Sequence, residues 1–394
     1  MIKKNLLIIA STARPYAEAA VRSGFSVSVI DAFADEEVSF LTEEMIAVPI
    51  GELGFEAKQL LIAVEQLSLQ NIYACLYGSG FEAQPTLLEN LANTLPVHGN
   101  SSQVLQQVKN VDIFFSALDL FKIPHPKVFK NFPEPCDQTL LVKSITGCGG
   151  QHIRNIDEKT LLMSGEYLQE YVEGESISVL FLAENAEGEN LAHIIGFNTQ
   201  WAAPSQEQPF RFGGIASNTE LTSACIIKLC KIVRQLSAHF QLVGLNSLDV
   251  VIKNEEIFVL EINPRLSASF ELYAQDWLEI FAVDLLALHM ICCSGQPLAW
   301  SVRKKLETLF EKNQPAKAMQ IIYAEHDIYL SGAIDWPEWV KDRPAMTKIG
   351  QQKSINILKG NPICTVISQG NTALSAISAV KTRVNLIHHM MLQV

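Results

Sequence analysis

The chain has 394 residues, of which 48% are hydrophobic and 18% charged, and its formal net charge is −12 at pH 7. This composition argues against disorder, and the length suits two or three domains. The negative charge disfavours nucleic acid or an anionic membrane as a partner, because both bind through clustered Lys and Arg. The eight cysteines form no CxxC pair, so we expect reduced thiols and a cytoplasmic protein.

The first hundred residues predict an α/β unit with a parallel sheet. Residues 5–30 read as strand, helix and strand, and further strands and helices follow as far as residue 98. Asp31 ends the second strand, where a dinucleotide fold places its ribose-binding acid. However, the turn ASTARP after the first strand lacks the glycines of GxGxxG, which disfavours an NAD site.

The loop GSGFE follows the predicted strand at 71–78. Ligands of open α/β sheets contact the carboxyl ends of the strands. Position alone therefore makes Gly78, Gly80 and Glu82 candidate substrate contacts. A tight turn that needs its glycines is the alternative interpretation.

A lysine and a glycine-rich loop come next in the segment LLVKSITGCGGQHI. The strand carries Lys143, and Gly147, Gly149 and Gly150 follow within seven residues. Glycines let backbone N–H groups approach phosphate oxygens, and the lysine adds a positive charge. The spacing is not that of a P-loop, and a hairpin turn explains it equally well.

Helices are predicted at residues 101–121, 219–240 and 271–293. Between the first two, residues 165–183 predict two short strands around a bend at Val172-Glu173-Gly174. Such a bend can offer backbone groups to a purine base and a carboxylate to a ribose, or it can be a simple hairpin.

Residues 245–269 predict a β-hairpin with acidic side chains. Glu261 and Asn263 are two apart on an extended strand, so they leave the same face. Asp249 joins them only if it lies cross-strand from Glu261, which requires an odd-numbered turn or a bulge. Three oxygen-bearing side chains on one patch suit Mg²⁺. A surface hairpin with acidic decoration is the alternative.

The last hundred residues predict a small β-rich unit. It includes a hairpin over residues 353–368 with its turn at Gly360-Asn361, and a closing helix that begins near Asn371.

In this order, the segments resemble the ATP-grasp superfamily of ligases. The matching stretches are Lys143 with TGCGG, then LQEYVEGESISV, then LDVV with VLEINPR. LEINPR is specific in this context, and the glycine loop carries less weight. NSLDVV, EINPRLSAS, GSGFE and GNPICTVIS are similar to a subgroup of ligases in C1-carrier biosynthesis, of the methanofuran and tetrahydromethanopterin type, which includes ligases resembling tyramine–glutamate ligase.

The resemblance covers nearly the whole chain. It implies an α/β fold that consists of three parts, of which the ATP-grasp part is of the α+β type. They are a pre-ATP-grasp domain with a parallel sheet at 1–99, an ATP-grasp nucleotide-binding and catalytic domain at 100–293, and a small β-rich domain at 294–394. It also implies an ATP-dependent carboxylate–amine ligase, which activates the acid as an acyl-phosphate and releases ADP and phosphate. The partners are then ATP and two small molecules, with no nucleic acid and no membrane. Many relatives are dimers.

The resemblance assigns roles residue by residue. Asp249, Glu261 and Asn263 would bind Mg²⁺ or Mn²⁺ and, through this ion, the ATP phosphates. Arg265 would steady the acyl-phosphate or the oxyanion, and Arg211 would hold the γ-phosphate. The residues expected to bind the nucleotide are Lys143 at the α- and β-phosphates, the glycine loop Gly147, Gly149 and Gly150 over the β- and γ-phosphates, and the adenine linker Glu170, Tyr171 and Val172.

Two positions depart from the family pattern. Many members have a lysine that aligns here near Val111, and the nearest lysine, Lys109, is two residues out of register. The ribose-binding acid aligns with Ser176, with Glu175 beside it as a substitute. These departures keep open a nucleotide-binding regulatory protein without turnover. A second alternative, which does not depend on them, is a biotin-carboxylase-like enzyme that activates bicarbonate.

Overall fold

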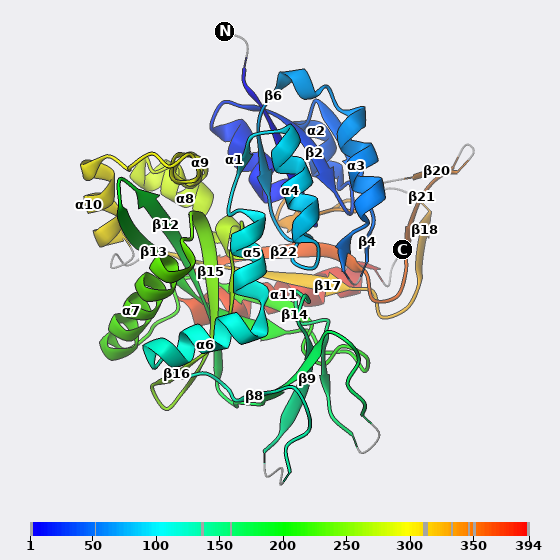
Figure 1. The fold of residues 1–394 in the computed structure, drawn as a ribbon. Helices are drawn as coiled ribbons and strands as arrows, with labels where there is room; N and C mark the ends of the chain where they lie inside the picture. The colour runs from blue at the N-terminus through cyan, green and yellow to red at the C-terminus, as the bar shows by residue number, and fades with distance from the viewer. Residues whose placement is uncertain are drawn as a thin grey trace.

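The computed structural model describes all residues except 1–2, 52, 135–137, 158–159, 310–313, 332–333, 346, 350–351 and 392–394. The chain opens with a parallel sheet in the order β3-β2-β1-β6-β7 (Figure 1). The strands of this sheet are β1 Asn5–Ala10, β2 Ser26–Asp31, β3 Glu44–Ala47, β6 Ile72–Tyr77 and β7 Val97–His98. A small hairpin and a 3₁₀ turn precede β6: β4 Ile50–Gly51, β5 Gly54–Phe55 and η1 Leu69–Asn71.

Helices cover both faces of this sheet, as a parallel sheet requires. Side chains from one face, such as Leu7 and Ile9, pack with α3 and α4, whereas Leu6 and Ile8 face α1 on the other side. The helices of this region are α1 Arg14–Arg22, α2 Glu36–Leu41, α3 Ala57–Gln66 and α4 Pro85–Thr94. The predicted parallel α/β unit is confirmed.

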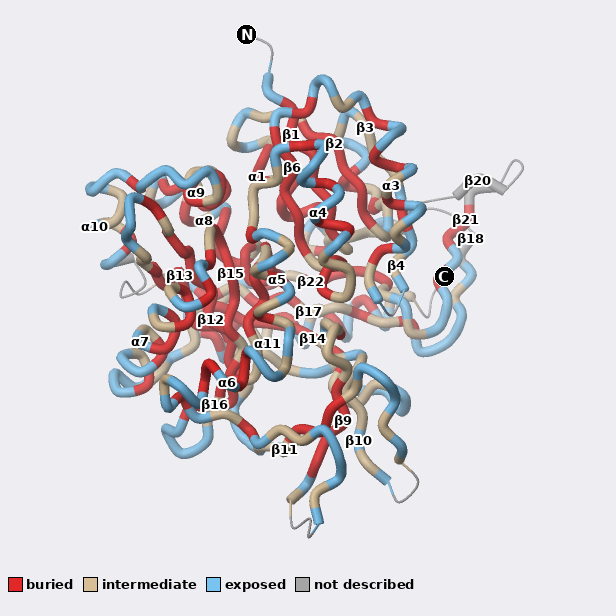
Figure 2. Tube along the Cα trace, in the orientation of Figure 1, coloured by how far each residue is buried: buried red, intermediate tan, exposed pale blue. Residues whose placement is uncertain are grey.

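An eight-stranded sheet forms the body of the molecule, in the order β16-β15-β12-β13-β14-β17-β22-β19. Its strands are β12 Glu175–Ala186, β13 Glu189–Ala202, β14 Phe212–Ala216, β15 Gly244–Lys253, β16 Glu256–Asn263, β17 Ala316–Tyr323, β19 Val340–Lys341 and β22 Pro362–Gly370. The buried residues follow these strands through the centre of the molecule (Figure 2).

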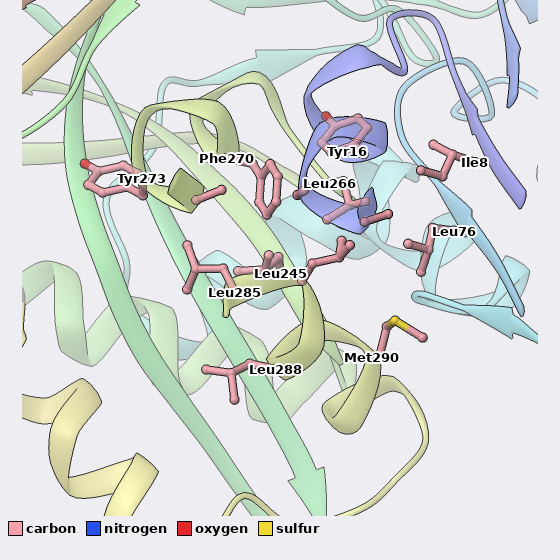
Figure 3. Close-up of a cluster of buried hydrophobic side chains, with 14 of the residues drawn as sticks. Ile8, Tyr16, Leu76, Leu245, Leu266, Phe270, Tyr273, Leu285, Leu288 and Met290 are labelled. Atoms are coloured by element: carbon pink, nitrogen blue, oxygen red, sulfur yellow. The ribbon is translucent and has the colours of Figure 1, made fainter. Parts of the chain in front are cut away.

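Two apolar cores hold this sheet on its opposite faces. On one face, Ile177 and Val250 pack against α6 (Val111–Phe121) and α7 (Ser223–Phe240). On the other, Leu245, Phe270 and Leu285 meet Tyr16 of α1, so this core also joins the parallel sheet to the body (Figure 3). The helices and turn that build these cores are α7 Ser223–Phe240, η2 Ala268–Phe270, α8 Glu271–Phe281, α9 Leu285–Cys293 and α10 Trp300–Leu309.

A small four-stranded sheet projects from the body (Figure 1). Among the residues that the structure describes, its core consists of the buried apolar side chains Leu140, Val142 and Leu168. Its strands are β8 Val128–Phe129, β9 Leu140–Ser144, β10 Ile153–Asn155 and β11 Glu166–Glu170.

The predicted hairpin at 353–368 is wrong. β21 Gln352–Ile357 pairs with β18 Ile328–Ser331 and β20 Thr347–Ile349, whereas β22 pairs with β17 and β19 in the large sheet. The turn at Gly360 is hydrogen-bonded to Ala324 rather than closing a ladder, so it passes the chain from one sheet to the other. α11, Ala373–Met391, packs on β17 and β22.

Two of the predicted helices are each broken in two. Residues 101–121 form α5 Ser102–Lys109 and α6 Val111–Phe121, because Asn110 has an extended ψ of 116° and caps α6 by accepting from the Ile113 N–H at 3.1 Å. Similarly, Ala282 in the left-handed region separates α8 from α9. In the part of the chain that the structure describes, no helix has the length and apolar character needed to cross a membrane.

Charged groups join the first and last parts of the chain. Arg14, which is completely buried, donates to Asp342 at 2.6 Å and to Glu271 at 2.8 Å. Asp35 lies beside this cluster and is only 3% exposed. Its burial and the nearby charges of Asp342 and Asp31 raise the pKa of Asp35 to about 9. The folded protein therefore keeps a proton on Asp35 that the unfolded chain loses near pH 4.

The Asp35→Asn substitution should stabilise the protein increasingly as the pH rises from about 4 to about 9. Over that range, Asp35 of the wild type is protonated in the folded state and ionised in the unfolded state, so the free energy of unfolding falls as the pH rises. Asparagine does not titrate, so the variant does not lose this stability. The difference in the free energy of unfolding should reach at least about 1.4 kcal/mol, the equivalent of one pKa unit. Denaturant titrations at several pH values would measure it. The exposed control Glu43→Gln should show no such trend, and a constant difference for Asp35→Asn would contradict the assignment.

Candidate functional site

The β15–β16 hairpin places Asp249 directly across from Glu261. Its turn has two residues, Asn254 and Glu255, both with positive φ, and that turn alone would put Asp249 opposite Leu260. The register shifts by one residue between Asp249 and Val250, and this bulge turns Glu261 onto the face of Asp249. The condition set by the sequence for a shared patch is therefore met, through a bulge rather than through an odd-numbered turn.

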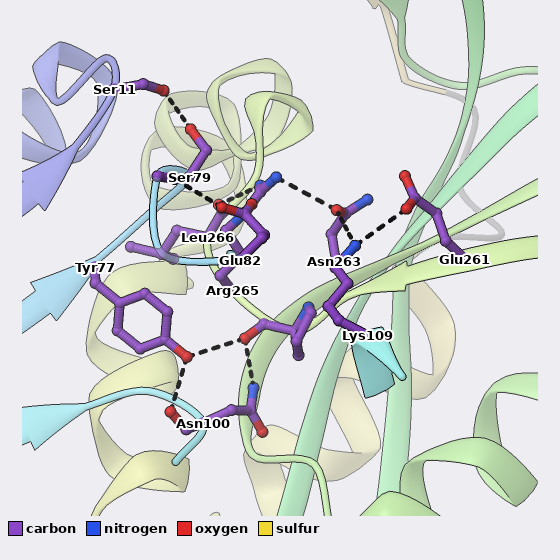
Figure 4. Close-up of polar contacts among 12 residues, drawn as sticks. Ser11, Tyr77, Ser79, Glu82, Asn100, Lys109, Glu261, Asn263, Arg265 and Leu266 are labelled. Atoms are coloured by element: carbon purple, nitrogen blue, oxygen red, sulfur yellow. Dashed lines mark hydrogen bonds and ion pairs between the residues drawn. The ribbon is translucent and has the colours of Figure 1, made fainter. Parts of the chain in front are cut away.

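Asn263 completes a group of three oxygen-bearing side chains. Its Nδ2 donates to Asp249 Oδ2 at 2.9 Å, which fixes the orientation of the amide and turns Oδ1 the other way. Oδ1 accepts from Lys109 Nζ and from Arg265, each at 3.3 Å (Figure 4). Lys109 also donates to Glu261 at 3.1 Å. We call Asp249, Glu261 and Asn263 the oxygen triad.

The two carboxylates of the triad differ in their electrostatic surroundings. Burial would raise the pKa of Glu261, but Lys109 and Lys143 outweigh it, and the pKa is lowered. Burial and the charge of Glu261 raise the pKa of Asp249. Gln200 donates to Asp249 at 3.3 Å, and Ser178 lies opposite Asp249 on the neighbouring strand. Glu261 is therefore the more acidic of the two carboxylates.

The triad suits a hard cation whose remaining ligands come from elsewhere. Among the described residues, no group of three or more His, Cys, Asp or Glu side chains could hold a metal ion by itself. Two carboxylates and an amide oxygen match the oxygen ligands that Mg²⁺ takes when phosphate groups and water complete its octahedron. The donor set thus fits a cation that is shared with a phosphate ligand.

Lys143 of β9 belongs to the same electrostatic group. Its side chain is buried, and Nζ donates to Gln169 at 3.3 Å. The charges of Lys143, Lys109 and Glu261 all act on His152, which follows the glycine loop, and burial lowers the pKa of His152 to about 4. The charges of the triad region therefore reach the end of the glycine loop, and the role of this loop at the phosphates remains a prediction.

The glycine loop has little room for side chains. A Cβ on Gly147 would meet the His152 ring at 1.9 Å, and one on Gly150 would meet the Phe210 carbonyl oxygen at 2.0 Å. The Phe212 N–H donates to the Gly149 carbonyl at 2.8 Å, which ties the loop to the start of β14. Gly147 and Gly150 are therefore required by close approach to the protein itself.

Arg211 is held by the protein. Its Nε donates to the Ala203 carbonyl at 3.2 Å, and one terminal nitrogen donates to the Gly360 carbonyl at 3.3 Å. The guanidinium also stacks over the Tyr323 ring, 3.7 Å from its centroid. These contacts join β14 to the C-terminal strands, and a role at the γ-phosphate remains a prediction.

Arg265 follows the triad directly and forms a buried ion pair with Glu82 at 2.5 Å. The second oxygen of Glu82 accepts from the Gly80 N–H at 2.8 Å. Both carboxylate oxygens of Glu82 are thus hydrogen-bonded within the protein, and Arg265 connects Glu82 to Asn263 of the triad (Figure 4). Gly78 and Gly80 lie where the order of the parallel sheet reverses between β1 and β6, the usual place for ligands in such sheets.

The predicted adenine linker lies between β11 and β12. The N–H groups of Glu170 and Tyr171 donate to the carbonyls of Lys127 and Thr139, each at 2.8 Å, and Val172 follows them half-buried. Along β12, strand alternation puts Ser176 on the face of Asp249 and Glu175 on the opposite face. Of the two, only Ser176 therefore lies on the face of the oxygen triad.

Several residues near the triad were missed by the sequence analysis. Lys109 was noted only as lying two residues away from the position of the family lysine. The helix break at Asn110, which ends α5 beside the triad, does not interrupt the apolar periodicity of the sequence. Gln200 and Ser178 come from strands whose alignment with β15 could not be predicted. The remaining member of this group is His152.

Comparison with known proteins adds three findings. Residues 113–269 match the family model described as an ATP-grasp domain. Tyramine–L-glutamate ligase of Methanocaldococcus jannaschii is 26% identical over 242 residues, 60% of this chain and 68% of that protein. The structure of an L-amino acid ligase from Bacillus licheniformis aligns over 97% of both chains, with a TM-score of 0.67 and 16% identity.

A further solved structure has a similar fold. The biotin carboxylase domain of the 2-oxoglutarate carboxylase from Hydrogenobacter thermophilus, a dimer in complex with MgADP, ADP and bicarbonate, aligns over 97% of this chain and 89% of that one. The TM-score is 0.70 and the identity 12%. Because the sequence identities are this low, the two similar structures show that the fold is shared and nothing more.

Replacing Gly150 with alanine should disturb the glycine loop far more than replacing Gly149. Both have positive φ, so both variants carry the left-handed strain of about 1 kcal/mol. Only Gly150→Ala adds a clash with backbone, since nothing lies within 4 Å of a Cβ on Gly149. Thermal unfolding and proteolysis of residues 144–155 would compare them. Equal behaviour of the two variants would contradict the described packing.

Proposed function

We propose, from the premise that this chain is an ATP-grasp ligase, that it joins a carboxylic acid to an amine through an acyl-phosphate. The family and the α/β fold expected from the sequence are confirmed by the matching domain and by the aligned structures. The observation that carries the proposal is the convergence of the oxygen triad, Lys143, the glycine loop and Arg265 on one site.

In the first step, a carboxylate oxygen attacks the γ-phosphorus of ATP and ADP leaves. In the second, the amine nitrogen attacks the acyl carbon, phosphate leaves and the amine loses a proton. Asp249, Glu261 and Asn263 would hold Mg²⁺ or Mn²⁺, which supplies charge neutralisation on the phosphate oxygens when bound. The protein's own work is positioning and electrostatic stabilisation.

The nucleotide would bind between the small sheet and the body. Lys143 would contact the α- and β-phosphates, and the loop with Gly147, Gly149 and Gly150 would cover the β- and γ-phosphates. Because the N–H groups of Glu170 and Tyr171 already donate to the carbonyls of Lys127 and Thr139, we assign the N–H contact with the base to Val172. Ser176 would face the ribose.

Arg265 would act on the acyl group. Its guanidinium is anchored by Glu82 at Nε and reaches Asn263 with a terminal nitrogen, so it is fixed within a few ångströms of the triad before substrate arrives. We assign Glu82 the positioning of Arg265, and the loop at Gly78 and Gly80 the contact with a substrate.

The similarity to tyramine–L-glutamate ligase over 60% of the chain supports an amine and an amino acid as substrates. The resemblance of the sequence motifs to the C1-carrier subgroup is the basis on which we propose a place in cofactor biosynthesis. We further propose the division into units at residues 99 and 293, although β17 and β22 of the last unit extend the sheet of the second. The dimer of the carboxylase neighbour supports testing for a homodimer.

The deciding experiment measures ADP release with a panel of carboxylic acids in the presence of hydroxylamine. An acyl-phosphate reacts with this small nucleophile to give a hydroxamate, whatever the natural amine. Hydroxamate formation that depends on the acid is expected. ADP release with bicarbonate alone would favour a carboxylase, and Mg²⁺-dependent ATP binding without any turnover would favour a regulatory protein.

Arg265→Ala should lower kcat by a factor of about 100 to 1,000, the usual effect of removing one preorganised donor. Affinity for ATP should change much less, because Arg265 is assigned to the acyl group. Single-turnover rates with the acid identified by the hydroxamate assay would test this. The helix-surface variant Arg22→Ala is the control, and near-normal turnover of Arg265→Ala would exclude the assigned role.

A further inference from the structure

Lys109 is the last residue of α5, and its ammonium group is inserted into the oxygen triad. Its side chain is 8% exposed, and Nζ lies 3.1 Å from Glu261 Oε2 and 3.3 Å from Asn263 Oδ1 (Figure 4). The helix ends here because Asn110 breaks it, and a cation at a helix C-terminus is favoured by the helix dipole. Local structure therefore delivers this charge to the triad.

The ammonium and a divalent ion cannot occupy the triad together. Mg²⁺ binds oxygen at about 2.0–2.1 Å, so an ion between Glu261 and Asn263 would lie in the space that Nζ now fills. The Asn263 amide is already turned correctly for such an ion, because Asp249 holds its Nδ2 and leaves Oδ1 facing the cation. Lys109 thus makes the contacts that a metal ion would make.

We propose that Lys109 is a displaceable stand-in for the divalent ion, which keeps the metal out of the empty site and admits it only together with the nucleotide. The inference rests on the proposed function, since it takes the triad as the metal site. When the nucleotide binds, the ammonium transfers from Glu261 and Asn263 to the phosphate oxygens. The vacated oxygens then receive the ion that the phosphates share.

Charge balance gives the physical reason. Asp249 and Glu261 face the two lysines Lys109 and Lys143, so the formal charges of these four groups cancel. A divalent ion alone would leave two uncompensated positive charges in a buried site. Triphosphate carries enough negative charge to neutralise both the ion and the released ammonium. Entry of the ion without nucleotide is therefore opposed, and joint entry is not.

The test measures Mn²⁺ binding by electron paramagnetic resonance on the full chain, without nucleotide. Wild type should bind Mn²⁺ weakly, and Lys109→Met should bind it at least ten times more tightly. Lys109→Arg keeps a cation and should resemble wild type. Lys130→Met is the matched control, because Lys130 pairs with Asp112 at 2.7 Å in an exposed position and should have no effect.

Thermal unfolding provides a second readout that does not depend on activity. Lys109→Met removes one of the two lysine charges that balance the carboxylates of the triad, so its Tm should be lower than that of wild type. Mg²⁺ alone should restore the Tm of this variant while leaving the wild-type Tm unchanged. This measurement also covers a variant that is too unstable for titration at room temperature.

The outcomes separate the inference from the proposed function. If wild type binds Mn²⁺ with a non-hydrolysable ATP analogue, but Lys109→Met gains no binding without it, Lys109 is not a stand-in and the metal site remains. If wild type binds no Mn²⁺ even with the analogue, the triad is not the metal site, and both the inference and the metal part of the proposed function are overturned.

Discussion

A one-residue shift in the β15–β16 ladder determines the chemistry of this molecule. Without the bulge after Asp249, the two-residue turn would send Glu261 to the face that packs against α7. A carboxylate there would be buried among apolar side chains without a partner, which is strongly unfavourable. With the bulge, the same residue meets Lys109 and Asn263. Apolar packing on one face and ion binding on the other are therefore compatible on one short strand.

The loop after β16 depends on a second constraint, the hydrogen bonds that fasten it to the parallel sheet. The Pro264 carbonyl accepts from Tyr77 at 3.2 Å and from Asn100 at 3.0 Å (Figure 4). Asn100 also bonds Val243 and Asn246 at the start of β15. Together with the Glu82–Arg265 pair, these bonds place Arg265 between the parallel sheet and the large sheet. Neither sheet alone could orient Arg265.

Sequence reasoning reached the features that depend on local pattern. The parallel sheet, the strand that carries Lys143 and the shared face of Glu261 and Asn263 all follow from apolar periodicity and strand alternation. It failed where distant segments decide the outcome. β22 does not pair with β21, its neighbour in the sequence, but with β17, which also pairs with β14. The residues on both sides of Asn110 have a helical pattern, so the sequence did not show that the helix ends there. The direction of the Lys109 side chain depends on that break and could not be predicted.

The continuation of the large sheet into the C-terminal strands has a consequence for folding. β14 pairs with β17, about a hundred residues later in the chain, and Arg14 pairs with Asp342, which is 328 positions away. Contacts of such separation form late and slowly, because long loops must close first. During synthesis, β14 therefore waits with an unpaired edge after the triad hairpin has emerged. This edge therefore needs protection from aggregation until β17 arrives.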